Sequence, residues 1–421
     1  MPIFRFTKSG SAGEDQGPWQ GAKPIEIADK YLQRARPGDA YYFGFDRNRE
    51  DPFFWSRTLF SLKRSGEPGR PILAEAGFMT HEGGVQLAPL PGGSVFFRQS
   101  GHRWAGKARP DTDGQPFLTV QESASHLRIA GFTFVGAPAS GFILFGNGGR
   151  KGTFSNVLIQ HLSATQVGRV VETMSDVHLD SLIVRDCDAY EIVRGFGRFR
   201  SISNSRFENL HLDAAGVDGG GERVCQILAF SSGSNVQFEN VTTKNAVNAL
   251  DAEKRGSDYV QGDGIVCERE TSDFVFRNCH SVGMGDGGFD IKTNGFLMEH
   301  SSARGCKYGL RIWAQADNTV RYCAFENPRT YGDVMGASVW VGGRADIVDS
   351  RLQAGPGTSA FRFWETEGTP HVRMFGGQID LDSDAELAMG SGTLELHDVA
   401  VNGELRNETV QSSDGFWGRL R

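Results

Sequence analysis

The sequence lacks several features that would assign it to a common class of protein. It contains no apolar run of the about eighteen residues that a membrane-spanning helix requires. Its formal net charge of −7 argues against general nucleic-acid binding, which needs a basic face. The opening residues Met1–Phe6 show neither the charged start nor the apolar segment of a signal peptide. We therefore expect no membrane span and no nucleic-acid partner.

The six cysteines show no CxxC spacing and no Cys/His pattern typical of a metal site. Three of them, Cys187, Cys279 and Cys323, recur in one local context, because an apolar residue, an arginine and a polar or aromatic residue precede each. A free cysteine behaves as a small hydrophobic residue. We therefore predict small apolar wall positions in a repeated structure rather than disulfides or redox chemistry.

The sequence is instead rich in glycine and phenylalanine, with 55 and 30 residues, which indicates many tight turns and many large rings to bury between them. Short β-rich segments recur along the chain, most of them about 20 to 30 residues apart, which is the period of a solenoid. Examples are Leu127–Ile129, Val157–Ile159, Val177–Leu179, Val236–Phe238, Phe274–Phe276, Phe296–Met298, Val372–Met374 and Leu394–Leu396. Amphipathic helical patterning is nearly absent between them, so stacked strands and turns are favoured over helical repeats.

One amphipathic helix is predicted, over residues 24–35, where it would cover the open end of the stacked strands. The predicted fold class is all-β, a right-handed parallel β-helix with a short N-terminal capping helix. We expect a single domain over residues 1–421, with the cap at 1–40, coils from about 41 to 400 and a less regular C-terminal tail from about 401 to 421. Stretches near 211–233 and 242–260 are predicted as loops, which often form binding walls.

Alignment of successive strands separates an inner from an outer face, because side chains alternate along a strand. The aligned segments are 264–268, 288–292, 309–313, 337–340 and 360–364. One inner column is Ile265, Phe289, Leu310 and Phe361, and the other is Cys267, Ile291, Ile312, Val339 and Phe363. The outer positions are Val266, Asp290, Arg311, Ser338 and Arg362, followed two residues later by Glu268, Lys292, Trp313, Trp340 and Trp364. Asp290 is thus expected beside Arg311, and Glu268 beside Lys292.

Three tryptophans, Trp313, Trp340 and Trp364, are predicted to form one outward column. Exposed large aromatic side chains usually mark a binding surface. With Arg362 and Glu268 they are the candidate substrate-binding residues, and stacking on a sugar is the role we expect of the three indoles. The alternative is simple packing under a loop, and for the charged residues it is an ordinary solvated surface.

Two acidic turns join this outer face, each with an aspartate between glycines: Asp263 in residues 262–264 and Asp286 in residues 285–287. With Asp290 they would place three carboxylates near one point. Such carboxylates repel one another unless a cation or shared protons settle the charge, and calcium accepts several carboxylate oxygens. We therefore predict that Asp263, Asp286 and Asp290 bind Ca2+. The simpler alternative is that Asp-Gly pairs only form turns.

These coils resemble the calcium-binding core of the family 9 pectate lyases and related right-handed β-helix polysaccharide lyases. The similarity rests on residues 262–264, 278–290 and 308–312. The family has an Asp-Gly turn, an Asp-Asp-Gly-Phe-Asp motif one coil later, and then a strand with the catalytic lysine. The resemblance implies that Asp263, Asp286 and Asp290 are calcium ligands and that Arg311 stands where the family has its lysine. This chain departs from the pattern at Arg311 and at Gly287, which replaces the second aspartate of the motif.

The reaction that the resemblance implies is calcium-assisted β-elimination on a polysaccharide that contains uronic acid. A cation on the uronate carboxylate stabilises the enolate-like transition state, a base removes the C5 proton, and the C4 glycosidic oxygen leaves. Arg311 is the first candidate for the base, although an arginine needs neighbouring cations and burial to become neutral. Lys292 is the second, since a desolvated lysine shifts its pKa more readily. The alternative for each is an ion pair, Arg311 with Asp290 and Lys292 with Glu268.

Other functions are compatible with the same scaffold. A glycoside hydrolase would need two carboxyl groups flanking one bond, and a C5 epimerase would share the proton abstraction. A non-catalytic carbohydrate-binding protein would bind through the tryptophans without turnover. The expected partner is an acidic polysaccharide or oligosaccharide. We expect a secreted or periplasmic protein whose leader is absent from this chain, with a cytoplasmic location as the alternative.

Overall fold

The computed structural model describes residues 2–7, 23–44, 60–79, 85–87, 96–98, 116–136, 141–218, 224–249, 259–331, 334–366 and 368–412. The described chain is mostly β-structure with parallel strands and one short α-helix, which confirms the predicted all-β class. It divides into two compact units, Met1–His211 and Leu212–Arg421. Residues 8–22 of the predicted cap and 413–421 of the predicted tail lie outside the described residues. None of the described helices is long and apolar enough to cross a membrane.

The first unit begins with the predicted helix, which is shorter than residues 24–35. A 3-10 turn, η1 (Ile25–Ile27), leads into α1 (Ala28–Leu32), and its apolar side packs inward. The Asp29 carboxylate accepts a hydrogen bond of 2.8 Å from the backbone N–H of Ser61, which ties the helix to strand β4. The strands up to the unit boundary are β1 (Ile3–Thr7), β2 (Lys23–Pro24), β3 (Ala40–Phe43), β4 (Phe60–Leu62), β5 (Ile72–Met79), β6 (Val85–Leu87), β7 (Phe96–Arg98), β8 (Leu118–Val120), β9 (Leu127–Ala130), β10 (Thr133–Val135), β11 (Ile143–Phe145), β12 (Gly152–Gln160), β13 (Ser163–Thr173), β14 (Val177–Phe199) and β15 (Ile202–Asp213).

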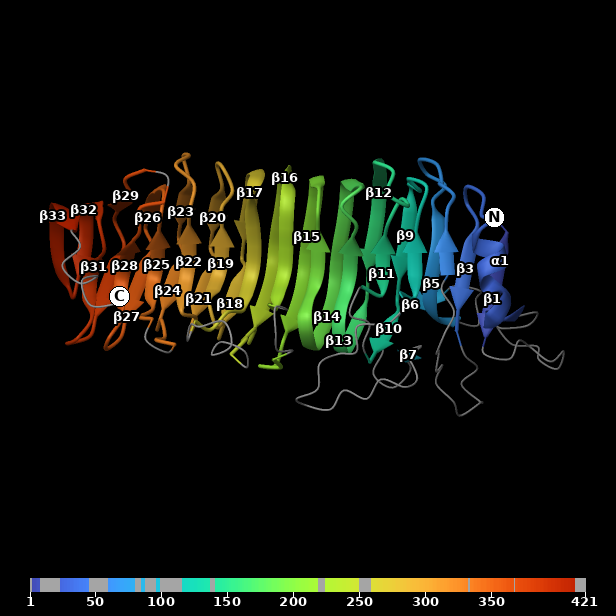
Figure 1. The fold of residues 1–421 in the computed structure, drawn as a ribbon, viewed down its shortest axis with the longest axis horizontal. Coiled ribbons are helices and arrows are strands. Elements are labelled where there is room, and N and C mark those ends of the chain that lie inside the picture. Colours follow the sequence, from blue (N-terminus) through green and yellow to red (C-terminus); the bar gives the residue numbers. More distant parts are fainter. Residues whose placement is uncertain are drawn as a thin grey trace. The chain divides into compact units, whose positions relative to one another are not determined.

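In the second unit, most turns of the chain contribute three short strands, and each strand pairs in parallel with its equivalent in the next turn (Figure 1). One wall contains β19, β22, β25 and β28; a second contains β20, β23, β26 and β29; a third contains β21, β24, β27 and β30. The strands are β16 (Gln226–Lys244), β17 (Asp263–Arg277), β18 (His280–Val282), β19 (Gly287–Ile291), β20 (Leu297–Glu299), β21 (Ser302–Arg304), β22 (Tyr308–Ile312), β23 (Thr319–Arg321), β24 (Ala324–Glu326), β25 (Ala337–Val341), β26 (Arg344–Val348), β27 (Arg351–Ala354), β28 (Ser359–Phe363), β29 (His371–Phe375), β30 (Gln378–Leu381), β31 (Glu386–Met389), β32 (Gly392–Val401) and β33 (Glu404–Ser412).

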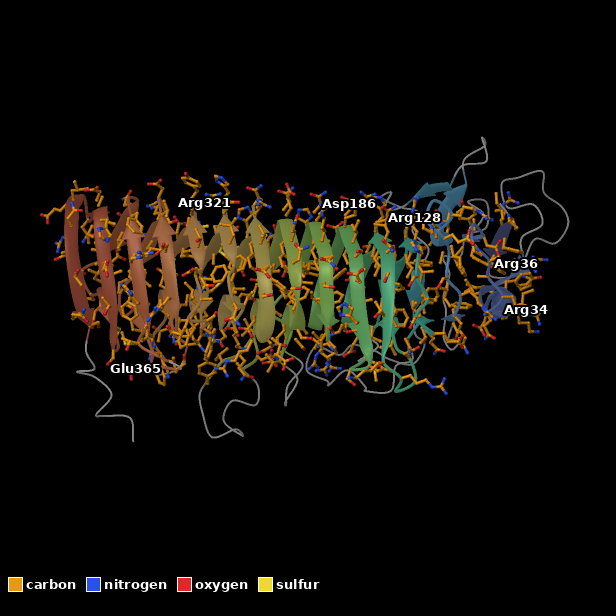
Figure 2. The ribbon with its side chains drawn as sticks, turned by 90° about the horizontal axis from the view of Figure 1, so that it is seen from above. Arg34, Arg36, Arg128, Asp186, Arg321 and Glu365 are labelled. Atoms are coloured by element: carbon orange, nitrogen blue, oxygen red, sulfur yellow. The ribbon has the colours of Figure 1, made fainter. Side chains whose placement is uncertain are left out.

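The core of this unit consists of columns of buried apolar side chains, one residue from each turn. The β19 wall contributes Ile265, Phe289, Leu310, Val339 and Phe361, and the β20 wall contributes Phe276, Met298, Val320, Ile347, Met374 and Leu396. Each fully buried side chain of this kind stabilises the fold by about 1.5–3 kcal/mol. Polar side chains point the other way, and Arg321 of β23 projects outward (Figure 2).

The corner between the second and third walls repeats in successive turns. Asn278, His300, Tyr322 and Asp349 adopt the left-handed backbone conformation, with φ of 50°, 49°, 57° and 43°. The backbone N–H of each donates to a carbonyl oxygen of the following turn. This corner places a small buried residue next in the chain, which is Cys279 or Cys323 in two of the turns. All six cysteines are free and buried, as predicted for apolar wall positions.

One strand of the β19 wall lies two residues away from its predicted register. We expected Val339 of β25 beside Ile312, but Val339 pairs with Leu310 and Trp340 pairs with Arg311. A shift of two residues keeps every side chain on the same face of the sheet. The prediction of which β25 side chains point inward and which point outward is therefore correct, but the predicted partners of these residues on β22 are wrong.

The described parts of the predicted loops and tail contain more regular structure than expected, and residues 219–223 and 250–258 of the loops lie outside the described residues. Residues from Gln226 onward, inside the predicted loop 211–233, belong to β16. Residues Glu404–Ser412, inside the predicted irregular tail, form β33, which pairs antiparallel with β32. An antiparallel strand at this position satisfies the backbone groups along one side of β32.

Candidate functional site

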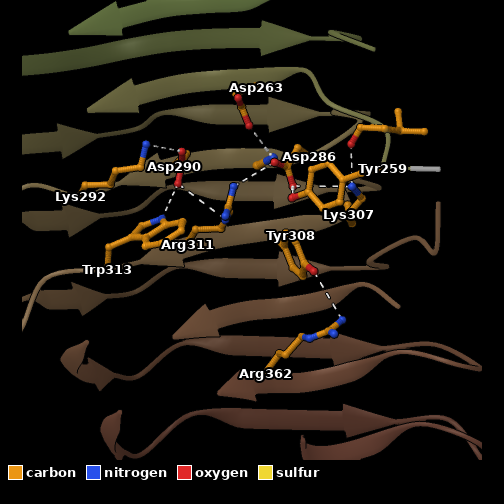
Figure 3. A network of polar contacts seen from close by, with 12 residues as sticks. Tyr259, Asp263, Asp286, Asp290, Lys292, Lys307, Tyr308, Arg311, Trp313 and Arg362 are labelled. Atoms are coloured by element: carbon orange, nitrogen blue, oxygen red, sulfur yellow. Dashed lines mark hydrogen bonds and ion pairs between the residues drawn. The ribbon is translucent and has the colours of Figure 1, made fainter. Parts of the chain in front are cut away.

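Figure 3 shows a group of charged side chains on the outer side of β17, β19 and β22, where the sequence predicted the site. Asp290 lies directly beside Arg311 in the strand register, as predicted. Arg311 Nη1 donates a hydrogen bond of 2.9 Å to Asp286 Oδ2, and Arg311 Nε lies 3.6 Å from Asp290 Oδ1. The guanidinium therefore joins two of the three predicted calcium ligands.

Burial and the neighbouring carboxylates determine the charge of Arg311. Burial alone would lower the pKa of the guanidinium, but Asp286 and Asp290 raise it above its ordinary value. The side chain is 12% exposed. Arg311 is therefore a permanent cation here, and this setting gives no support to its predicted role as the base.

Asp263 begins β17, the strand that pairs with β19, one turn of the chain before Asp286 (Figure 3). Its Oδ1 accepts a hydrogen bond of 2.8 Å from the backbone N–H of Gly287. Burial raises the pKa of this carboxyl group well above its ordinary value, and the negative charges of Asp286 and Asp290 raise it further. The three predicted calcium ligands are thus brought together, and the pKa of one of them, Asp263, is raised.

Lys292 follows β19 and forms the predicted pair with Glu268. Its Nζ lies 3.0 and 2.9 Å from the two carboxylate oxygens of Glu268 and 3.3 Å from Asp290 Oδ2. Burial alone would lower the pKa of this amine, but Asp290 and Glu268 raise it. Lys292 is therefore also a cation, 17% exposed at its side chain, and its predicted role as a second candidate base gains no support.

Two residues that the sequence analysis did not select complete the cluster. Tyr259 donates a hydrogen bond of 2.7 Å from its hydroxyl to Asp286 Oδ1. Lys307 Nζ lies 3.5 Å from the centre of the Tyr259 ring, donates to the Val260 carbonyl oxygen at 2.6 Å, and is 3.8 Å from Asp286 Oδ1. Tyr259 comes from the stretch predicted as a loop at 242–260.

Lys307 differs from the other two cations because it is fully buried. Burial lowers the pKa of its amine to about 8, although Asp286 opposes this shift. Among the three cations that surround the aspartates, it is the one whose pKa moves toward neutrality. Alternation along the strand gave no signal for it, because residue 307 lies before β22 begins at Tyr308.

Aromatic rings surround the guanidinium of Arg311, but not as the predicted column. Its carbon atom Cζ lies 4.7 Å from the centre of the Trp313 ring, 5.2 Å from that of Trp340 and 5.5 Å from that of Tyr308. Trp340 pairs with Arg311 on one side and with Arg362 on the other. The predicted outward column of three tryptophans is therefore wrong, because the register of β25 differs by two residues.

The candidate substrate-binding residues differ in exposure. Trp340 is 4% exposed and packs against Trp313 with ring centres 4.4 Å apart, whereas Trp364 is 41% exposed. Arg362 is buried, and its Nη1 donates to the Met335 carbonyl oxygen at 2.6 Å. Trp340 and Arg362 are thus packed inside the protein in this structure. Trp364 has the exposed face that stacking on a sugar requires.

The donors around the three aspartates bear directly on the predicted calcium site. Asp263 accepts from Gly287, Asp286 from Arg311 and Tyr259, and Asp290 from the indole N–H of Trp313 at 2.6 Å. Within the described residues, no group of three or more His, Cys, Asp or Glu side chains is arranged to hold a metal ion. Calcium would have to compete with these donors for the carboxylate oxygens, and Ca2+ binding by Asp263, Asp286 and Asp290 stays a prediction.

The chain was compared with known proteins by sequence and by structure. Its sequence matches no protein-family model and no curated protein. Its fold is similar to the crystal structure of pectate lyase Pel9A, with 11% identity, a TM-score of 0.51, and coverage of 79% of this chain and 76% of that one. It is also similar to the GH136 lacto-N-biosidase from Eubacterium ramulus, with 10% identity, a TM-score of 0.57, and coverage of 94% and 68%. The predicted resemblance to the parallel β-helix lyases is therefore confirmed for the fold.

Proposed function

We propose that this protein is a polysaccharide lyase that cleaves a uronic-acid-containing polysaccharide by β-elimination, on a right-handed parallel β-helix. The observation that supports this proposal is the pair of cations Arg311 and Lys292, which Asp286 and Asp290 hold on the outer face of β19 and β22. The side chains of Lys292 and Arg311 are 17% and 12% exposed, and the proposal requires that an anionic group from solution reach them. A uronate carboxylate has the charge and the two-oxygen geometry that a guanidinium recognises.

The chemistry follows from the position of this positive charge. The C5 proton of a uronate is weakly acidic because the adjacent carboxylate is already negative. The guanidinium of Arg311, hydrogen-bonded to that carboxylate, would stabilise the charge that develops when the proton leaves. The base takes the C5 proton, the C5–H electron pair forms the C4–C5 double bond, the bond from C4 to the glycosidic oxygen breaks, and that oxygen takes a proton from solvent water.

The base in this proposal is Lys307. Its pKa of about 8 gives a neutral fraction at physiological pH that Arg311 and Lys292 do not offer. A base is most effective when its pKa lies near the working pH. Because the Tyr259 ring lies against Nζ, the sugar must displace that ring before Lys307 can reach the C5 proton.

The test is an assay on a panel of uronate polymers, in calcium and in a chelator, that follows both ultraviolet absorbance of the unsaturated product and new reducing ends. We expect absorbance and reducing ends to rise together with the native protein. The Arg311→Ala variant should show neither. Reducing ends without absorbance would identify a hydrolase, and a change of sugar configuration at constant chain length would identify an epimerase. Binding without any turnover would contradict the proposal.

Glycoside hydrolysis is the second candidate, and the raised pKa of the Asp263 carboxyl group favours it. A hydrolase needs one protonated carboxyl group as an acid and one ionised carboxylate beside it. Burial raises the pKa of Asp263, while the neighbouring Asp286 is bound to Arg311. An Asp263→Asn variant would separate the two candidates, because it should abolish hydrolysis but leave proton abstraction by Lys307 measurable.

The proposed substrate also defines the partner and the location of the protein. An acidic polysaccharide is found outside the cytoplasmic membrane, so we propose that the protein acts as a secreted or periplasmic enzyme. Antibody detection in the cell fractions of the native host tests this directly, and a signal confined to the cytoplasm would contradict it.

A further inference from the structure

We propose that Arg311 takes the place of a bound metal ion, so that this site neutralises its aspartates with an internal guanidinium and does not bind calcium. For catalysis this inference rests on the proposed function, since the same guanidinium would then meet the substrate carboxylate. The statement about calcium stands apart from that function, and a binding experiment without substrate can test it.

The first argument is the set of contacts that the carboxylates already make. Arg311 Nη1 is 2.9 Å from Asp286 Oδ2, and its Nε is 3.6 Å from Asp290 Oδ1. Lys292 Nζ is 3.3 Å from Asp290 Oδ2, and Lys307 Nζ is 3.8 Å from Asp286 Oδ1. Each oxygen of the two carboxylates thus has a cationic group near it. A divalent ion would have to displace these groups and lie beside the charges that remain.

The second argument concerns Gly287, the position at which the resemblance to the lyase family fails. A Cβ atom at residue 287 would lie 3.2 Å from Asp263 Oδ1, 3.3 Å from Arg311 Cδ and 3.3 Å from Asp290 Cβ. These distances are tighter than ordinary van der Waals contact. A side chain at 287 therefore competes for space with Arg311 and with Asp263.

The third argument concerns the rings around the guanidinium. The ring centres of Trp313 and Trp340 lie 4.7 and 5.2 Å from Arg311 Cζ. The indole N–H of Trp313 also donates a hydrogen bond to Asp290 Oδ1. A planar cation interacts favourably with aromatic faces when it is desolvated. Calcium instead requires six to eight oxygen ligands. The surroundings of this position therefore suit a guanidinium better than a hard metal ion.

The experiment measures binding of Tb3+, a luminescent probe of calcium sites, and competition by Ca2+, with the full chain and no substrate. Tyr259 and Trp313 lie close enough to the carboxylates to sensitise a bound ion. We expect the native protein to bind no Ca2+ at up to about 1 mM, the weak end of the affinities that protein calcium sites show. Arg311→Ala removes the guanidinium from Asp286 and Asp290, and we expect it to bind Ca2+ with a Kd at least about tenfold below that limit.

Arg373→Ala is the matched control. It removes an arginine that holds Asp346 through contacts of 2.8 and 2.7 Å, on another wall of the same unit. This variant should gain no site, because it removes the cation from one carboxylate rather than from two. Thermal unfolding gives a second measurement: calcium should raise the midpoint of Arg311→Ala and leave that of the native protein unchanged.

Binding of Ca2+ by the native protein, abolished in Asp290→Asn, would overturn the inference. An Arg311→Ala protein that folds only when calcium is present would support it. If that variant does not fold under any condition, Arg311→Gln and the native protein decide the matter by the same titration. A native protein that degrades a uronate polymer only with calcium would also overturn the inference, while leaving the proposed lyase activity intact.

Discussion

The guanidinium of Arg311 is surrounded by anionic oxygens and by aromatic rings. An arginine in such a setting holds its proton more firmly, so it serves to bind or stabilise an anion rather than to remove a proton. Lys307 lies on the opposite side of Asp286, and burial there shifts its pKa the other way. Burial and the number of nearby carboxylates thus give these two cations different pKa shifts and different proposed roles.

We expect Lys307→Met to lower the rate of elimination by about 10²–10⁴-fold, the usual contribution of a general base. In the native protein the rate should rise with pH through about 8, because a base acts in its deprotonated form and the pKa of Lys307 is about 8. A pH–rate profile measures this. Lys292→Met is the matched control, and the midpoint of its pH–rate profile should equal that of the native protein. Full activity of Lys307→Met would contradict the assignment.

Gly287→Asp would restore the lyase family's motif, and we expect it to destabilise this chain. Its Cβ would press on Asp263 Oδ1 and Arg311 Cδ, and its carboxylate would add another buried charge. The expected loss is about 2–4 kcal/mol of unfolding free energy, measured by urea unfolding. Gly287→Ala isolates the steric part and should cost less. Combination with Arg311→Ala should recover part of the loss, whereas additive effects would show that the two positions are independent.

At the scale of the strand, three glycines define how closely adjacent turns approach. A Cβ at Gly264 would lie 2.4 Å from the Gly288 carbonyl oxygen, one at Gly288 would lie 2.6 Å from that of Gly309, and one at Gly309 would lie 2.6 Å from that of Ser338. No side chain fits this column without movement of the backbone. The glycines therefore hold β17, β19 and β22 in the register that brings Asp290 beside Arg311.

The sequence was sufficient for this part of the site and insufficient for the next strand. Repeated glycine, apolar and charged positions defined the pairing of residues around 265, 289 and 310. For β25, alternation along the strand has a period of two residues, so it could not distinguish registers that differ by two residues. Tyr259 had no strand pattern to locate it, and the pKa of Lys307 depends on burial that only the folded chain creates.

The altered register of β25 leads to a prediction for the tryptophans. Trp340→Ala should lower the free energy of unfolding by about 3–5 kcal/mol, because Trp340 is buried against Tyr308, Ala337 and Trp313. Trp364→Ala should cost less than about 1 kcal/mol, since its side chain is 41% exposed. If Trp364 stacks on a sugar, its loss should raise KM with little change in kcat. An equal loss of stability in both variants would contradict this division.

At the scale of the whole molecule, each turn of the second unit contacts the turns before and after it through pairing in three walls. Such stacking gives stability that is approximately a sum of terms from neighbouring turns. The candidate site spans β17, β19 and β22, so its geometry depends on adjacent turns more than on distant ones. The period of the sequence predicted the stacked turns. The residues between the strands have no such period, so their positions could not be predicted in the same way.

The reactivity of the buried cysteines in this unit can report the order in which its turns unfold. Cys225, Cys267, Cys279, Cys306 and Cys323 occupy different positions along the stack, and none is exposed. Burial raises the pKa of Cys279 and Cys323 to about 12, so their thiols react only after local opening. Pulsed alkylation in increasing urea, followed by peptide mass analysis, should label them in a graded order if turns open singly. Simultaneous labelling of all five would instead show that the unit opens as one cooperative block.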